Sequence, residues 1–357
     1  METTANNIFV SSYYEHLAPL TPIVLKNYSS PSTHLTLLTE EPVLTVTMLT
    51  IASRHMKLSG NGANSRAYSI HEKLWSYLRG MIERLFWGQE KFGDCGGASA
   101  PRQFDASNPL SAGQGQRGGG QLRSIGTVEA LLLLTDWHPR ALHFPPGDDE
   151  NTLLDVDPQQ LNYFDGEGDD HFHDHPGKGQ GGAGEGRLAF YKWLEPVWRS
   201  DRMSWMLLST AQALAFELGI FDQKNDLRAS TESSCEMARK RRLRRLILVY
   251  VSQSSGRLGI PSMLPLPQWN QNTEPLRAED MQSPNFHEDY MIDMMQDCWM
   301  DISKIMYNSN QVLFLSKELT TNLIKSGQYR DRIDEFTPSL RDFKAKLDKL
   351  SGTHIIS

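Results

Sequence analysis

The sequence predicts an all-α fold, a multi-helix domain interrupted by two glycine-rich insertions, and three observations support this fold class. Apolar residues recur at three- and four-residue steps along several segments, as they do on one face of a helix. No stretch of useful length alternates apolar and polar residues in the way of a half-buried strand. Proline and glycine stand at the ends of the apolar-periodic segments, where helices begin and end.

The first helices are predicted before residue 140. Pro42 suits the first turn of a helix that continues through residues 43–56. Residues 66–91 carry leucine and isoleucine at three- and four-residue steps, which predicts an amphipathic helix. A third helix is expected from about Thr127 to Trp137, and it ends before Pro139 because the residue before a proline disfavours helical backbone.

Further helices are predicted after Ser200. The first carries Leu207 and Leu214 on one face and has Gly219 as its C-terminal cap. We expect that face to pack on the apolar side of a helix that contains residues 243–250. Another helix covers residues 291–305. The last begins at Thr337, which acts as its N-cap, and its apolar face carries leucine and phenylalanine: Leu340, Phe343, Leu347 and Leu350.

Glycine divides the chain. Of the 27 glycines, 9 lie in residues 93–126 and 8 in residues 166–186. Neither segment has enough large apolar side chains to offset the entropy of ordering it, so we expect two disordered insertions in one domain. The predicted boundaries are a helical part at 8–92, a linker at 93–124, a helix of the same domain at 125–146, an acidic insertion at 147–187 and a helical part at 188–351.

The acidic character of the chain is local. The formal net charge is −7, yet residues 147–187 alone contain 11 Asp and Glu against Lys178 and Arg187. This segment also carries His171, His173 and His175, a composition typical of some metal-binding tracts. A bound ion needs ligands in fixed geometry with supporting neighbours, which a glycine-rich segment does not supply. We therefore favour a solvated acidic loop and expect no metal site.

Other function classes are disfavoured by what the sequence lacks. The three cysteines, Cys95, Cys235 and Cys298, are too far apart for a structural zinc site and predict no disulfide framework. Neither a secretory signal nor a membrane-spanning apolar run is expected, which predicts a soluble intracellular protein. No hydrolase, metalloprotease or nucleotide-binding motif occurs, so no enzyme, catalytic residue or cofactor is expected in this chain.

One basic segment has two interpretations. It could be a nuclear import signal or contact phosphates. Alternatively, it is the solvated N-terminal part of a packed helix, with Arg242 facing solvent, and we favour this interpretation because basic runs are weak motifs. The segment contains six basic residues among seven: Arg239, Lys240, Arg241, Arg242, Arg244 and Arg245.

Three stretches carry a family resemblance. Residues 126–146 contain Trp137-His138-Pro139-Arg140, and residues 193–261 join a small-residue helix to the basic helix. The first stretch, within residues 8–56, contributes Tyr14, Leu17, Pro19, Pro22, Ile23, Ala52, Ser53 and Arg54. Together they resemble the regulatory middle region of fungal zinc binuclear cluster transcription factors, known as the fungal-specific transcription factor domain. The stretch at residues 126–146 resembles the subgroup related to the yeast activator of aromatic amino acid catabolism.

The resemblance implies a nuclear, non-catalytic regulatory domain. Such a domain responds to a metabolite, here first an aromatic amino acid, and contacts other transcription proteins or a second copy of itself. It binds DNA only through an N-terminal six-cysteine cluster that holds zinc, which this sequence lacks, so we expect either a fragment of a longer protein or a gene model that has lost its ends. Leu246-Ile247 and Ser252-Gln253 depart from the tryptophan pair and the Asp-Arg pair of the family. The alternative function is a helical interaction scaffold unrelated to transcription.

Overall fold

A computed structural model describes residues 8–56, 58–89, 122–143, 182–221, 234–264 and 286–354, with side chains of the helix ends 182–193, 234, 286–289 and 353–354 left out. Every regular element in these ranges is helical, which confirms the all-α prediction. The main α-helices are α2 (His34–Glu40), α3 (Pro42–His55), α4 (Ala63–Phe86), α5 (Ile125–Asp136), α6 (Arg140–His143), α7 (Gly182–Glu217), α9 (Ser234–Leu258), α11 (Phe286–Leu313), α12 (Lys317–Ser326), α13 (Tyr329–Asp334) and α14 (Thr337–His354).

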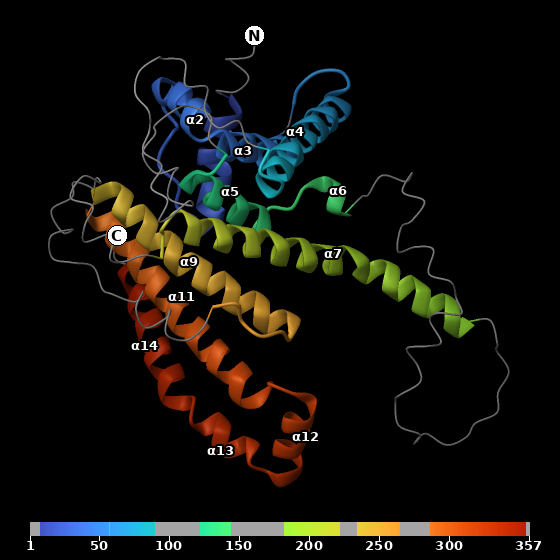
Figure 1. Ribbon diagram of the computed structural model, residues 1–357, viewed down its shortest axis with the longest axis vertical. Coiled ribbons are helices and arrows are strands. Elements are labelled where there is room, and N and C mark those ends of the chain that lie inside the picture. The colour runs from blue at the N-terminus through green and yellow to red at the C-terminus, as the bar shows by residue number, and fades with distance from the viewer. Residues whose placement is uncertain are drawn as a thin grey trace.

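The helices form two groups on either side of α7 (Figure 1). α2, α3, α4 and α5 lie on one side, where α3 packs against both α4 and α5. On the other side α9, α11 and α14 run alongside one another, and α11 lies between the other two. α7 contacts α5 along much of its C-terminal half, while its N-terminal end extends away from the rest of the molecule.

α5 is the most deeply buried helix of the first group. Its residues from Gly126 to Thr135 are all buried, including a run of four leucines at 131–134. A helix that is apolar on every side belongs in a core, because no face of it is suited to water. The Ser124 hydroxyl caps its N-terminus by accepting a hydrogen bond from the Thr127 backbone N–H. The predicted end of this helix before Pro139 is confirmed.

α7 differs from its prediction in where it begins and in which helix its buried face contacts. The helix begins at Gly182, inside the predicted acidic insertion, and continues through Pro196. Its buried face packs mainly on α5 and less on α9, and Leu214 lies beside Leu85 and Arg123, whereas we expected it to face α9. The Gly219 prediction is confirmed: its φ is 68°, and the Ile220 N–H bonds to the Ala215 carbonyl at 2.9 Å, as in a Schellman cap.

Two further predictions concern the apolar face of α14 and the glycine-rich segments. The predicted apolar face of α14 is only partly buried, because Leu340 and Leu347 are 42% and 44% exposed whereas Leu350 is buried. The segments that we predicted to be disordered, 93–124 and 147–187, lie mostly outside the described residues. Where the structure enters the first of them, Leu122 is buried in the core. The buried core therefore includes a residue of the predicted linker.

Within the described ranges, no single helix has the length and apolar composition to cross a membrane. One pair, Pro31–Glu40 with Pro42–His55, satisfies both criteria only when its two members are joined, and it is bent by 119°. Ten of the residues of α3 in this pair are buried against the rest of the protein. Cys235 and Cys298 are free thiols.

Candidate functional site

The basic segment lies within α9 rather than at its start. α9 begins at Ser234 and has Glu236 in its first turn, so the first basic residue, Arg239, comes more than one turn later. The unfavourable interaction of a cation with the helix dipole fades within the first turn. The basic residues therefore face little of that penalty, and their positions are decided by what surrounds them.

Arg239 is the centre of a buried ionic cluster formed with Glu41 and Glu129. Its Nε donates to Glu129 Oε1 at 2.6 Å and its Nη2 donates to Oε2 at 2.5 Å, a bidentate pair. Its Nη1 lies 3.3 Å from Glu41 Oε1. Only 15% of the Arg239 side chain and 2% of the Glu129 side chain are exposed. The cluster joins α9 to α5 and to the start of α3.

Glu41 also holds the N-terminus of α5. Its Oε2 accepts a hydrogen bond from the Gly126 backbone N–H at 3.1 Å and another from the Ser124 hydroxyl. A carboxylate is favourable there, because the first N–H groups of a helix have no partner within the helix. The Glu41 carboxylate therefore forms an ion pair with Arg239 of α9 and also accepts hydrogen bonds at the N-terminus of α5.

The electrostatics of the cluster favour the charged form of Arg239, whereas burial opposes the charged form of Glu129. Burial alone would lower the pKa of Arg239, but the carboxylates of Glu129 and Glu41 raise it well above its ordinary value. Burial raises the pKa of Glu129, and the adjacent Arg239 guanidinium partly offsets that rise. Each charge thus depends on the other, because an unpaired charge in this interior would be strongly disfavoured.

The other arginines of the segment contact two different parts of the protein. Arg241 Nη2 and Arg242 Nε lie 3.1 Å and 3.4 Å from the two carboxylate oxygens of Asp293 on α11. Arg245, which is 1% exposed, pairs with Asp297 on the same helix at 3.0 Å. Arg244 donates from Nε to the Ile220 carbonyl just after α7.

The interpretation of this segment as a solvated helix face is therefore wrong. Arg242 does not face solvent, since only 14% of its side chain is exposed. Five of the six basic residues bind α3, α5, α11 or the end of α7. The nuclear import signal stays a prediction, and a receptor would have to compete with these contacts. The sequence offered a signal for one acidic partner, since Glu129 lies in the middle of the otherwise apolar helix α5.

The approach of Gly126 to Glu41 leads to a first prediction. A Cβ atom on residue 126 would lie 2.2 Å from Glu41 Oε2, so Gly126→Ala must displace the carboxylate from its cluster. We expect the free energy of unfolding to fall by about 1–3 kcal/mol, the usual range for overpacking. Gly80→Ala in α4 is the control, because its Cβ meets nothing within 4 Å and should stabilise the helix by roughly 0.5–1 kcal/mol. Urea unfolding measures both, and equal gains would show that Glu41 is not held in place.

The segment from Trp137 to Arg140 anchors a second polar cluster between α3, α4, α5 and α7. His138 Nε2 lies 3.0 Å from the Ser204 hydroxyl of α7, and the Arg54 guanidinium donates to the His138 carbonyl. His71 Nδ1 lies 3.0 Å from the Thr50 carbonyl, while its Nε2 accepts from the Arg140 N–H at 3.1 Å. This arrangement requires a neutral His71, because a proton on Nε2 would face the Arg140 N–H.

The histidines of this cluster are poorly suited to carry charge. Burial, followed by the nearby His143, Arg54 and Arg257, lowers the pKa of His138 to about 4. Burial is also the main reason that the pKa of His71 is lowered. Among the described residues, the His138 ring contacts the hydroxyls of Ser200 and Ser204 on α7, so it joins the end of α5 to that helix.

These shifts predict a loss of stability in acid. Between pH 6.5 and about 4 the unfolded chain protonates residue 138 while the folded protein does not, so falling pH favours unfolding across this window. His138→Gln can keep a hydrogen bond to Ser204 but cannot titrate. The free energy of unfolding of this variant should therefore fall less between pH 7.5 and pH 4.5 than that of the parent protein. Identical slopes for the two proteins in urea titrations would contradict this assignment.

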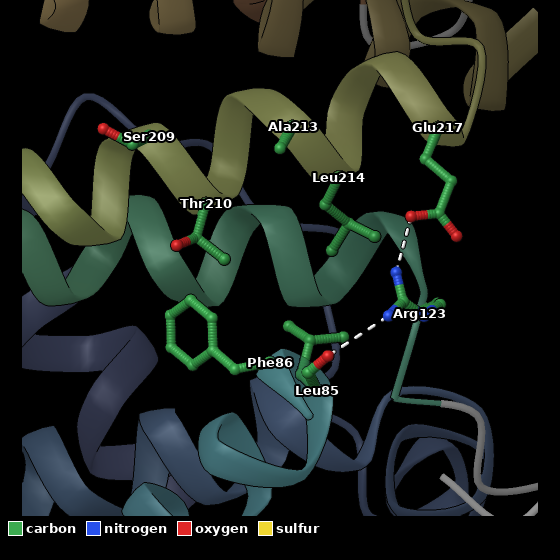
Figure 2. Close-up of a pocket in the computed structure, with 8 residues that line it drawn as sticks. All are labelled: Leu85, Phe86, Arg123, Ser209, Thr210, Ala213, Leu214 and Glu217. Atoms are coloured by element: carbon green, nitrogen blue, oxygen red, sulfur yellow. Dashed lines mark hydrogen bonds and ion pairs between the residues drawn. The ribbon is translucent and has the colours of Figure 1, made fainter. Parts of the chain in front are cut away.

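An open surface groove lies between the end of α4 and the C-terminal half of α7 (Figure 2). Its volume is about 300 Å³, at the lower end of the range for small-molecule sites. Arg123 and Glu217 form an ion pair of 2.5 Å at one end, and Arg123 also donates to the Leu85 carbonyl at 3.1 Å. The lining residues are Leu85, Phe86, Arg123, Ser209, Thr210, Ala213, Leu214 and Glu217.

The residues considered for a metal site lie elsewhere. His171, His173 and His175 fall outside the described ranges, so the prediction of no metal site is untested there. Among the residues that the structure does describe, no group of three histidine, cysteine or acidic side chains could hold an ion.

The sequence matches no protein-family model, and no solved structure matches it. It is similar to Transcription factor hmgR of Aspergillus fumigatus, with 31% identity over 349 residues. The similar region includes 95% of this chain but 41% of that protein, so the chain spans less than half the length of the relative. The zinc cluster, the middle-domain assignment and the aromatic catabolism subgroup stay predictions. The comparison confirms the coarser prediction, that this chain is similar to a fungal transcription factor.

Proposed function

We propose that the chain acts in transcription regulation, as the effector- and partner-responsive helical domain of a fungal zinc-cluster transcription factor. The observation that carries this proposal is the similarity to a transcription factor along 95% of the chain. The all-helical fold agrees with a regulatory role without catalysis. The similarity also favours this role over a scaffold unrelated to transcription.

The finer parts of the proposal follow from the family resemblance. The domain would act in the nucleus on genes of amino acid catabolism, with an aromatic amino acid as its effector. It would contact other transcription proteins, and a second copy of the chain is a further partner. Zinc would be bound by a cysteine cluster outside this sequence, and DNA would be contacted through that cluster alone.

A reporter experiment tests the regulatory role. The whole chain, fused to an unrelated DNA-binding domain, should change transcription from the matching reporter, and an aromatic amino acid in the medium should alter that effect. Leu131→Asp places a charge in the core and should abolish the regulation, since the domain would unfold. A folded fusion that changes transcription neither with nor without the amino acid would overturn the proposal.

The placement of the basic segment yields a third prediction. Because Arg239 and its neighbours already bind carboxylates of this protein, the chain should not recognise a DNA sequence. Basic residues alone give contacts that weaken steeply with salt and do not distinguish sequences. In gel-shift assays at physiological salt we expect no preference among DNA sequences. A preference that persists under these conditions would show that a DNA-reading surface lies in this chain.

A further inference from the structure

Arg54, in the last turn of α3, carries a half-buried charge that no carboxylate of the described residues neutralises. Its guanidinium donates to the His138 carbonyl, and it forms no ion pair within the described ranges. Burial lowers the pKa of Arg54, and the nearby cation Arg140 lowers it further. A cation removed from water is disfavoured unless an opposite charge lies beside it. The missing counter-charge is one that a bound anion can supply.

Four histidines lie near enough to Arg54 for its charge to influence them: His55, His71, His138 and His143. Burial lowers the pKa of each of these rings, and the Arg54 charge adds to that effect in every case. Among the described residues, the one carboxylate that raises any of these pKa values is Glu72, which acts on His71. The surroundings of Arg54 within the described ranges are therefore more positive than negative.

Two of the four rings are available to a ligand. The rings of His71 and His138 are held by the hydrogen bonds described above. The rings of His55 and His143 form no hydrogen bond within the described part of the chain, and each contacts a second ring instead. The ring centroids of His55 and Trp137 are 5.1 Å apart, and those of His143 and His138 are 6.4 Å apart. A neutral imidazole has one N–H group, so both available rings can donate to a ligand.

The available donors come from two elements and can be reached from solvent. Arg54 and His55 end α3, whereas Arg140 and His143 are the first and last residues of α6. His55 and Arg140 are exposed, and the other two are half-buried. The Arg140 guanidinium lies over the Tyr68 ring, 4.2 Å from its centroid, and a guanidinium stacked in this way keeps its N–H groups at its edge for polar partners.

This set of donors favours a compact oxyanion with more than one negative charge. A carboxylate presents two oxygens in one plane, whereas a tetrahedral oxyanion presents acceptors in several directions and can be contacted from two elements at once. Two guanidinium groups with no carboxylate beside Arg54 favour a dianion over a monoanion.

We propose that the end of α3 and α6 form a binding site for a tetrahedral dianion, either free phosphate or the phosphate group of a small monoester. Arg54 supplies the central charge, and His55, Arg140 and His143 supply further donors. Binding of this anion does not depend on the proposed function. Because α6 packs on α7, an anion held between α3 and α6 would stabilise the arrangement of these three helices.

Calorimetry on the full chain in Tris chloride tests the chemistry of the site. The probes are inorganic phosphate, sulfate, glycerol 3-phosphate and acetate, with chloride added to keep the ionic strength equal. Phosphate and sulfate should bind with saturation, and acetate should bind at least about tenfold more weakly. Tighter binding of glycerol 3-phosphate than of phosphate identifies a monoester as the ligand, and the reverse order identifies the free ion. Equal binding of acetate and phosphate, or no saturable binding of either dianion, would contradict the proposal.

Variants then locate the site. Arg54→Met removes the central charge, so phosphate binding should fall at least about tenfold. His143→Leu removes a donor that has no other hydrogen bond, so binding should fall at least about threefold while the melting temperature without phosphate stays unchanged. Arg79→Met is the control, because it removes the same charge from an exposed ion pair on α4 and should leave phosphate binding unchanged.

A second measurement keeps the test decisive if Arg54→Met does not fold. Phosphate should raise the melting temperature of the parent protein, because it binds the folded state, and the rise should be smaller in a protein that carries both His55→Leu and His143→Leu. An undiminished rise in that double variant would place the anion elsewhere. If neither phosphate nor sulfate raises the melting temperature of the parent, Arg54 serves only the carbonyl groups around the end of α3, and the proposal is wrong.

Discussion

Replacing Arg239 with methionine is expected to lower the free energy of unfolding by about 3–5 kcal/mol, the cost of removing one partner from a buried ion pair. Methionine keeps much of the apolar stem of the side chain and removes the charge. Glu129, which is 1% exposed, would then lie next to Glu41 without a cation. Guanidinium chloride unfolding at pH 7.5 measures the loss.

The control for this prediction is Arg79→Met. Arg79 pairs with Glu83 at 3.5 Å, but both side chains are about 60% exposed, so the loss should stay below about 1 kcal/mol. Adding Glu129→Gln to Arg239→Met should recover part of the stability, because a neutral amide does not carry the charge penalty. If the two arginine variants lose equal stability, the Arg239 cluster does not behave as a buried pair.

Truncating the core of α5 has the second large expected effect. Leu131 is fully buried in α5, which packs against α3, α7 and α9. Leu131→Ala should lower the free energy of unfolding by about 2–5 kcal/mol, because it removes apolar burial and leaves a cavity. Thermal and urea unfolding give the value, and the helical circular dichroism at low denaturant shows whether the variant still folds.

Leu35→Ala serves as the matched control. Leu35 lies on α2 and is 72% exposed, so the same truncation there should change stability by no more than about 0.5 kcal/mol. A similar loss at both positions would mean that α5 is not the centre of the core. A loss at Leu131 alone would support the arrangement in which α5 is buried between α3 and α7.

Local rules in the sequence were sufficient for the fold class and for several helix ends. Pro42 begins α3 and Gly219 caps α7, as predicted, because the backbone preferences of proline and glycine act within one turn of helix. The periodicity of apolar residues predicted α4 and α11 for the same reason. The start of α7 was missed, since helix periodicity fades where glycine and charged residues dominate.

The candidate groove could not be found from the sequence. Its lining residues come from the end of α4, from Arg123 and from α7, and each is ordinary in its local context. Only the packing of α7 on α5 brings Glu217 to within 2.5 Å of Arg123. Composition and spacing do not show which distant surface residues become neighbours in the folded protein.

By itself, the sequence determined that this protein is helical, where proline and glycine begin and end helices, and which kind of protein it resembles. The tertiary structure alone decided which groups the basic segment contacts. A run of cations on a helix is equally compatible with solvent, nucleic acid or a buried ion pair. The choice depends on Glu41 and Glu129, which lie 198 and 110 residues away from Arg239 in the chain. Charge interactions depend on distance in space, so only the folded arrangement determines which charges meet.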